Sequence, residues 1–228
     1  MERLSRKQVI ALADKTGDAS GYDLSGLDLS SLDLIAMRFL GSNLKGADLS
    51  KANFSSSEFD GADLSGCNLG SSNFTAASFR DADMKGADLS FSTFAGADFS
   101  GAVLKEANFA NSKIAAAIFE KADLAGANLQ MTDAACVRLA GAVLRGADGY
   151  GASMTGACLS GADLRGVKFH GADLNGADLS SGDLRDADFL EVSLIGADLS
   201  NADLRGSRLK SADLTRARLD GARLSEGE

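Results

Sequence analysis

A large apolar residue recurs at every fifth position of this chain from Leu24 to Leu224, with no change of phase. Leu, Phe, Ile or Met fill all but two of these 41 positions, the exceptions being Ala134 and Gly149. A strict period of this length indicates one small unit stacked many times along an axis, rather than a single globular core. The surface of such a repeat is better suited to binding a partner through its shape and charge than to catalysis.

Each unit contains a small residue, a polar residue and the large apolar residue in succession, as in Ala162-Asp163-Leu164. The small and large residues lie two apart, so they share the inner side of an extended segment while the polar residue faces water. The three-residue step to the next small residue breaks this alternation, and the frequent glycine within it predicts a turn there. A helix is excluded because a period of five rotates each apolar residue by about 140°.

Residues of one type also recur at a spacing of twenty. Phenylalanines do so at Phe39, Phe59, Phe79, Phe99 and Phe119, and basic residues do so at Lys45, Lys85, Lys105, Arg145, Arg165, Arg185 and Arg205. This spacing predicts four units in each coil, with like residues stacked above one another. About ten coils at a separation of about 4.8 Å would form a rod roughly 48 Å long.

These A(D/N)LXX units resemble those of the pentapeptide-repeat proteins over about residues 24–226. The resemblance implies an all-β solenoid, a right-handed quadrilateral parallel β-helix with the large and small residues inside. Right-handed connections between parallel strands are also the general rule. Several members of this family resemble B-form DNA in width and charge, bind DNA gyrase or topoisomerase IV in its place, and so protect against quinolones.

The N-terminus departs from the repeat. Ser5-Arg6-Lys7-Gln8 has the pattern of a capping box and Gly17 is a stop signal, so we predict a short capping helix at about 6–15. We assign 1–20 to this cap and its lead-in, and 21–226 to the repeat. Large residues occupy the first small positions and are expected to fill the mouth of the rod beneath the helix; they are Tyr22, Leu27, Leu32 and Met37.

The C-terminal coil has no comparable cap in the sequence. The association coil, as we call it, has as its large residues Leu209, Leu214, Leu219 and Leu224. Two alternatives remain open for it: a homodimer that forms end to end through this coil, or protection of the end by charged side chains. Those side chains are Arg216, Arg218, Asp220 and Arg223.

Several functional classes are disfavoured by the sequence. The single histidine, His170, follows a large apolar residue and so faces solvent, and the carboxylates recur evenly instead of pairing in a cleft. We predict no enzymatic activity and no catalytic, metal-binding or cofactor-binding residues. The three cysteines lack metal-ligand spacing and are expected to be reduced thiols. The sequence shows no membrane span or signal peptide, and we expect a cytoplasmic bacterial protein.

The charge of the chain bears on a DNA-mimicking role. The 23 basic and 32 acidic residues give a net charge of −9, which disfavours direct nucleic-acid binding. A 48 Å rod would need on the order of 28 negative charges to match duplex DNA. The basic column borders aspartates such as Asp163 and Asp183, which predicts a self-neutralising mixed ladder. A more negative face is expected at an acidic column formed by Asp48, Asp88, Asp148 and Asp188.

A run of apolar residues is expected on one outward face. Tyr150, His170 and Leu190 each follow a large apolar residue at a spacing of twenty, with Phe91 and Met131 at neighbouring corners. We call these five residues the apolar strip and predict that it binds a partner, because contiguous exposed apolar patches usually mark contacts. The leading hypothesis is a non-enzymatic protein-binding scaffold. The alternatives are a DNA-mimicking modulator of a type II topoisomerase (DNA gyrase or topoisomerase IV) and a structural spacer.

The two gaps in the apolar series also carry an expectation. Ala134 and Gly149 lie close together, with Val137 at a usually small position between them. We predict a locally repacked coil there and a bend in the rod near residues 124–164.

Overall fold

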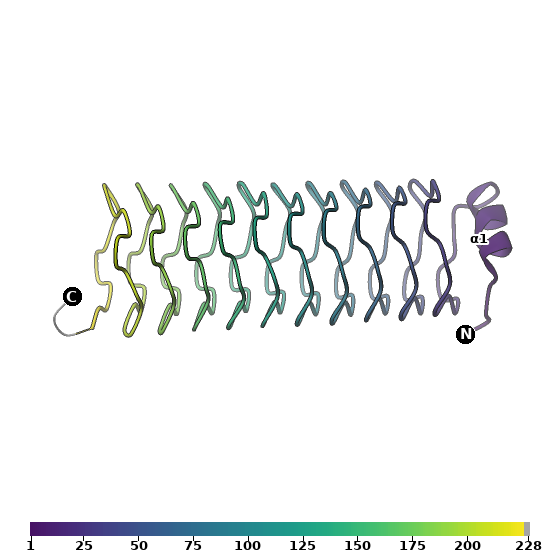
Figure 1. The fold of residues 1–228 in the computed structure, drawn as a ribbon. Helices are drawn as coiled ribbons and strands as arrows, with labels where there is room; N and C mark the ends of the chain where they lie inside the picture. The colour runs from purple at the N-terminus through teal and green to yellow at the C-terminus, as the bar shows by residue number, and fades with distance from the viewer. Residues whose placement is uncertain (226–228) are drawn as a thin grey trace.

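The computed structural model describes residues 1–225, which wind into a rod of stacked coils with one helix, α1 (Arg6–Ala13), at the N-terminal end (Figure 1). Isolated parallel β-bridges join each outward polar position to the residue twenty places later, from Arg3–Asp23 to Asp203–Arg223. Four five-residue units therefore pass before the chain returns to the same column. This agrees with the spacing of the phenylalanines and basic residues in the sequence.

The turn between units depends on a left-handed residue. As far as Gly221, the second residue after each large apolar position has a positive φ, whether it is glycine, as at Gly46 (64°), or not, as at Lys51 (58°). Glycine adopts this conformation without the Cβ clash that costs other residues roughly 1–2 kcal/mol, which explains why it is the commonest residue there. The predicted turn position is confirmed.

The core consists of the large apolar residues stacked in columns, with the small residues between them. Two adjacent columns of phenylalanine fill the N-terminal half, and the rings within a column stack in parallel: Phe59 and Phe79 have centroids 5.0 Å apart and planes 5° apart. Rings of the two columns meet edge to face, as Phe74 and Phe79 do at 5.5 Å. Both arrangements are favourable for aromatic pairs.

The expected bend near residues 124–164 was wrong. The parallel bridges continue without interruption through Asp133–Ser153 and Asp148–Lys168, and the coils stack along a straight axis (Figure 1). The ring of Phe169, from the next coil, occupies the space that a larger residue at Gly149 would need. A Cβ built on Gly149 would lie 2.5 Å from two carbons of that ring. The gap in the sequence is therefore filled from the neighbouring coil.

The N-terminal segment closes the first coil with both a strand and a helix. The amide of Asp23 donates to the carbonyl of Glu2 (2.8 Å), and the amide of Leu4 donates to the carbonyl of Asp23 (3.1 Å). The capping box forms as predicted, with the amide of Ser5 donating to Gln8 Oε1 (2.8 Å). Leu4 and Val9 are buried against the coil beneath.

The coil beneath α1 carries the large residues that were expected to fill the mouth. Tyr22, Leu27 and Leu32 are partly buried against the core, and Met37 is fully buried. Parallel bridges also begin at Arg3 and Asp18, before the predicted start of the repeat at 21, while its predicted end at 226 lies outside the described residues. No helix among residues 1–225 is long and apolar enough to cross a bilayer.

Candidate functional site

The apolar strip lies along one corner of the rod, in two adjacent columns. Tyr150, His170 and Leu190 follow one another in the first column, and the rings of Tyr150 and His170 have centroids 5.6 Å apart. Met131 belongs to the second column, and its sulfur lies 2.7 Å from the position that a Cβ on Gly151 would take. The glycine next to Tyr150 thus makes room for Met131, which brings Met131 into the same patch.

The members of the apolar strip differ in exposure and spacing. Phe91 (66% exposed), Met131 (57%) and Tyr150 (52%) present most of their side chains to solvent, whereas Leu190 is half-buried. Phe91 lies two coils from Met131, with Asn111 in the coil between them. From Phe91 to Leu190 the strip spans about five coils, or about 24 Å at the usual strand separation. The structure therefore forms one compact patch at Met131–His170, with Phe91 as an outlying member.

Two residues of the apolar strip occupy the left-handed turn position, where glycine is the commonest residue but not the only one. Phe91 (φ 57°) and Met131 (φ 56°) are left-handed, and bulky side chains adopt this conformation at a cost in free energy. Both side chains are exposed, so burial in the core does not offset that cost. Residues held in strained conformations at the surface are more frequent at functional sites.

The acidic column is less negative than its four aspartates suggest. Each carboxylate accepts a hydrogen bond from the backbone two residues later, as Asp148 does from the amide of Tyr150 (3.1 Å). Asparagine amides also donate to the column, as Asn68 does to Asp48 (3.1 Å) and Asn108 to Asp88 (3.0 Å). Asp188 pairs with Arg208 at 3.1 Å. These carboxylates shape turns and stack with neutral or basic neighbours, so they do not form a continuous negative stripe.

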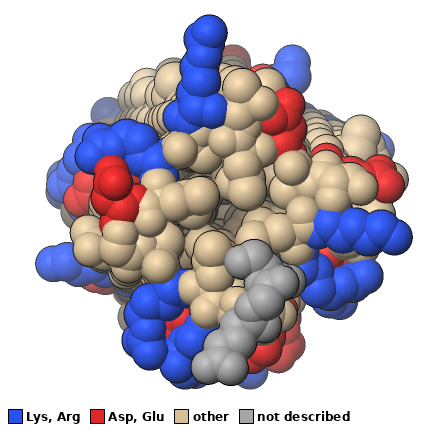
Figure 2. Space-filling view, turned by 90° about the vertical axis from the view of Figure 1, so that its left-hand side faces the viewer, with Lys and Arg blue, Asp and Glu red and all other residues tan. Residues whose placement is uncertain are grey.

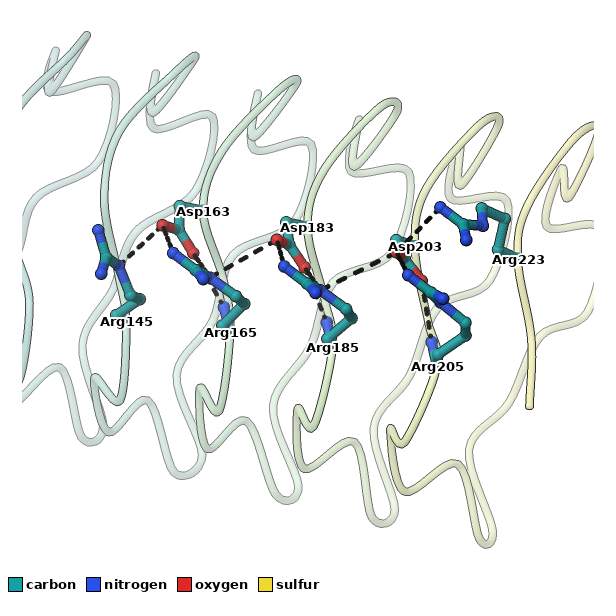
Figure 3. Close-up of polar contacts among 8 residues, drawn as sticks. All are labelled: Arg145, Asp163, Arg165, Asp183, Arg185, Asp203, Arg205 and Arg223. Carbon is teal, nitrogen blue, oxygen red and sulfur yellow. Dashed lines mark hydrogen bonds and ion pairs between the residues drawn. The ribbon is translucent and has the colours of Figure 1, made fainter.

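The mixed ladder forms on another face, where carboxylates lie between successive guanidinium groups along the rod (Figure 3). Asp163 contacts Arg145 and Arg165, each at 2.8 Å. The pattern continues through Asp183 and Asp203, ending at Arg223, which lies 3.4 Å from Asp203. Exposed pairs of this type contribute about 0–1 kcal/mol each, and their main effect here is to cancel charge.

Asp203 lies where three arginines converge on the mixed ladder. The side-chain hydrogen bond from Arg205 (2.6 Å) is the main reason that the pKa of Asp203 falls to about 2, and the charge of Arg223 lowers it further. Because the pKa is depressed in the folded state, this carboxylate stabilises the fold above about pH 4. That contribution is lost as the pH falls through the folded-state pKa.

The variant Asp203→Asn is therefore expected to be less stable than the parent at pH 7, with the difference shrinking between pH 4 and pH 2. Other carboxylates titrate in both proteins, so the difference between the two curves isolates Asp203. Urea unfolding at a series of pH values measures it. Arg205→Gln should reproduce the same flattening, and parallel curves for parent and variants would contradict the role given to this pair.

The association coil is the last coil among the residues that the structure describes. Its leucines, together with Leu199, Leu204 and Lys210, line a cavity of about 370 Å³. Figure 2 shows tan side chains around the centre of this end, with basic and acidic side chains on the outer rim of the rod. Leu219 (37% exposed) and Leu224 (39%) are among the most exposed leucines of the chain. The self-association predicted for this coil is not tested by a single chain and stays a prediction.

The remaining candidates for chemistry are few. Within residues 1–225, no three His, Cys, Asp or Glu side chains lie close enough together to hold a metal ion. The thiol of Cys67 is buried and lies 2.8 Å from the carbonyl of Leu44, and burial raises its pKa to about 12. Cys136 is exposed and Cys158 half-buried, and both are free thiols.

Among the exposed apolar residues that were not singled out from the sequence, two directly follow a large apolar position. Ile35 (52% exposed) and Ile195 (40%) follow Leu34 and Leu194 on a face next to the apolar strip. They occupy the same place in the five-residue unit as Tyr150, so comparison of that place across all four faces would have found them. They are 160 residues apart and thus lie in distant coils, and we assign neither to the strip.

Comparison with known proteins identifies a matching family model and similar solved structures. A family model described as pentapeptide repeats matches eight times, at residues 23–61, 57–90, 82–119, 102–134, 137–166, 159–190, 172–210 and 187–226. Among solved structures the chain is similar to HetL, a pentapeptide repeat protein involved in heterocyst differentiation regulation from the cyanobacterium Nostoc. The sequence identity is 27%, the TM-score is 0.62, and 99% of each chain is covered.

A second similar structure is that of a trypsin-treated variant of QnrB1, a plasmid-mediated fluoroquinolone resistance protein. It has 21% identity and a TM-score of 0.48, with 92% of this chain and 91% of that chain covered. A search of curated proteins found no match. With repeat matches running from residue 23 to residue 226, and with five-residue units that return to the same column every twenty residues, the chain belongs to the pentapeptide-repeat family.

Proposed function

We propose that this protein is a non-enzymatic scaffold that binds another protein through the apolar strip. The scaffold itself would be a right-handed quadrilateral β-helix of about ten coils, acting in the bacterial cytoplasm. The observation that carries the proposal is the placement of Phe91 and Met131. Both are bulky, apolar and exposed at left-handed positions where glycine would be more stable. Other non-glycine residues such as Lys51 share this conformation, but a large apolar side chain exposed there suits a binding surface.

The patch around Tyr150 supports the same function. Tyr150 packs beside His170, and Met131 lies against Gly151 next to them, so three side chains form one continuous surface. Aromatic residues and methionine are enriched in the cores of protein interfaces. The similarity to HetL, a protein involved in the regulation of heterocyst differentiation, supports a regulatory use of such a rod over that of a plain spacer.

The DNA-mimicking alternative finds less support in the charge distribution. The mixed ladder cancels much of the charge on one face, and the acidic column alternates with asparagine, lysine and arginine. The net charge of −9 is about a third of the roughly 28 negative charges that a duplex of similar length carries. We expect micromolar protein to leave DNA gyrase supercoiling unchanged, with or without a quinolone.

Replacing Phe91 and Met131 with glycine is expected to weaken partner binding at least tenfold while raising the free energy of unfolding by about 1 kcal/mol per site, because strain is relieved. Pull-down of a tagged protein from a lysate of the source organism, with quantitative mass spectrometry, identifies which proteins are lost. Denaturant unfolding gives the stability. Tyr150→Ser should lose the same proteins.

Ile195→Ser provides the matched control, because it removes an exposed apolar side chain outside the apolar strip. It should retain every partner that Phe91→Gly and Tyr150→Ser lose. If the strip variants retain all partners and their circular dichroism spectra are unchanged, the apolar strip does not bind a partner and the proposal is wrong. Inhibition of gyrase by the parent protein would favour the topoisomerase alternative instead.

A further inference from the structure

A groove of about 520 Å³ lies on the side of the rod and reaches the apolar strip at Phe91. Its rim includes three residues of one corner column, in which Ser71 is the short side chain between two longer ones. Its floor includes three outward residues of the adjoining face. We call it the polar groove, and these six residues are Lys51, Ser71 and Phe91 on the rim and Asn53, Asn73 and Thr93 on the floor.

The face that contains the polar groove carries no carboxylate over four coils. Segments 50–56, 70–76, 90–96 and 110–116 form this face and its two corners, and their only charged residues are Lys51 and Lys113. All eight acidic residues between positions 50 and 116 lie on the other three faces of the same coils. This part of the surface is therefore positive, although the chain as a whole has a net charge of −9.

The two lysines of this face are not neutralised by the rod itself. Both are exposed, and neither makes an ion pair within residues 1–225. Asp33 lines the N-terminal end of the groove, and Asp133 follows Lys113 in the next coil. These carboxylates border the positive stretch at its two ends. Unlike the arginines of the mixed ladder, Lys51 and Lys113 can each meet a carboxylate from a partner.

The floor of the polar groove offers hydrogen-bond donors in excess of acceptors. Asn53 Oδ1 accepts from the amide of Ser55 (3.2 Å) and from Asn73 Nδ2 (3.1 Å). Asn73 Oδ1 accepts from the amide and the hydroxyl of Thr75, at 3.0 and 2.7 Å. The carboxamide oxygens are thus used within the rod, whereas Asn53 Nδ2 donates to no acceptor within residues 1–225. A ligand rich in acceptor oxygens, above all carboxylates, complements this floor.

We infer that the polar groove binds an extended acidic segment of the same protein that contacts the apolar strip. Carboxylates of that segment face Lys51 and Lys113, which lie three coils apart, or about 14 Å at the usual strand separation. An apolar side chain between them packs on Phe91. Because an extended chain rises about 3.3 Å per residue, the two carboxylates are about four residues apart. This inference rests on the proposed function, since Phe91 belongs to both surfaces.

A short acidic segment suits the polar groove better than other occupants do. Nucleic acid carries a charge about every 1.7 Å of duplex, so it would extend past the lysines onto Asp33, Asp133 and the acidic faces beyond. A second copy of this chain has its backbone amides and carbonyls paired between coils, so its coils offer no free segment to enter a groove. The bordering carboxylates limit the acidic stretch of the partner to the length between the two lysines.

Selection of a phage-displayed library of random twelve-residue peptides on the purified protein tests this inference. Enriched peptides should carry two acidic residues about three to five positions apart, with an apolar residue between them. Synthetic versions, followed by fluorescence anisotropy, should bind at least tenfold more weakly to Lys51→Glu. Asn73→Asp keeps the size of the side chain but adds a carboxylate to the floor, and it should weaken binding at least fivefold.

Lys121→Glu is the matched control for Lys51→Glu. Lys121 is exposed and has the same φ of 58° at another corner of the rod, so this variant should bind the peptides like the parent. Selection that enriches no peptide, enriched peptides that are neutral or basic, or equal binding to the parent and Lys51→Glu would overturn the inference. So would a twelve-nucleotide single-stranded DNA that displaces the peptides, or a dimer in sedimentation velocity that Lys51→Glu dissociates.

Pull-down from the lysate separates a failure of this inference from a failure of the proposed function. Lys51→Glu and Asn73→Asp should lose the partners that Tyr150→Ser loses. If they retain those partners, the groove is not part of the interface and the inference is wrong, while the scaffold function stands. If Tyr150→Ser retains every partner, the scaffold function fails instead. Peptide affinity of Tyr150→Ser should match that of the parent, because Tyr150 does not line the polar groove.

Discussion

Replacing Phe79 with alanine is expected to lower the free energy of unfolding by about 3–5 kcal/mol, the usual cost of removing a buried phenylalanine. Phe79 is fully buried and stacks between Phe59 (5.0 Å) and Phe99 (4.8 Å). Its edge also contacts Phe74. Because the rings form a column, the cavity left by the substitution removes contacts from the coils on both sides. Guanidinium unfolding followed by circular dichroism measures the loss.

Phe91→Ala is the matched control for this prediction. It makes the same substitution twelve residues away, at a side chain that is 66% exposed. Its effect should stay within about 0.5 kcal/mol, as is usual for surface substitutions. A loss below about 1 kcal/mol for Phe79→Ala, or equal losses for the two variants, would contradict the assignment of the phenylalanine columns to the core.

Restoring the repeat at Gly149 is expected to destabilise the protein. Leucine fills most large positions of the sequence, yet Gly149→Leu should cost about 2–3 kcal/mol because the ring of Phe169 already occupies the space. The Cβ alone would meet that ring at 2.5 Å. Thermal and denaturant unfolding of the variant measure the cost.

A second substitution tests the cause of that cost. The single variant Phe169→Leu replaces the ring with a smaller side chain. In the otherwise unchanged protein it should leave a cavity and lower the free energy of unfolding. In the Gly149→Leu background it should instead recover at least half of the lost stability, which a double-mutant cycle records as a coupling energy. Additive effects of the two substitutions would show that Gly149 and Phe169 do not share this space.

Much of the fold could be predicted because one five-residue unit specifies it locally. The position of each large residue determines which side chains face inward, and the left-handed turn residue explains the glycines. The spacing of twenty gives the column in which each residue lies. The bend expected between Ala134 and Gly149 was wrong because sequence spacing does not show that Phe169, twenty residues later, can reach into the vacant space.

The positions of the candidate sites could be predicted from the sequence, but the contacts and exposure of their side chains could not. The twenty-residue spacing determines the column of each residue, so the residues of the apolar strip and of the acidic column lie in the columns that the sequence predicts. Side-chain contacts do not follow in the same way. The sequence could not show that Met131 lies against Gly151, that Leu190 is half-buried, or that asparagine amides donate to Asp48 and Asp88. Those contacts depend on side-chain rotamers, which are determined by the packing of neighbouring coils in the folded protein.

Site-specific photocrosslinking tests the central claim that one face of this rod binds a protein partner. The four residues that follow the large positions of a single coil are Ala135, Ala140, Arg145 and Tyr150, one on each face. A benzophenone amino acid at each position, activated by light in living cells, reports which face contacts the partner. The account predicts a discrete crosslinked product from position 150 and none from positions 140 and 145. Equal crosslinking from all four positions, or a product from position 140 or 145 without one from position 150, would contradict it.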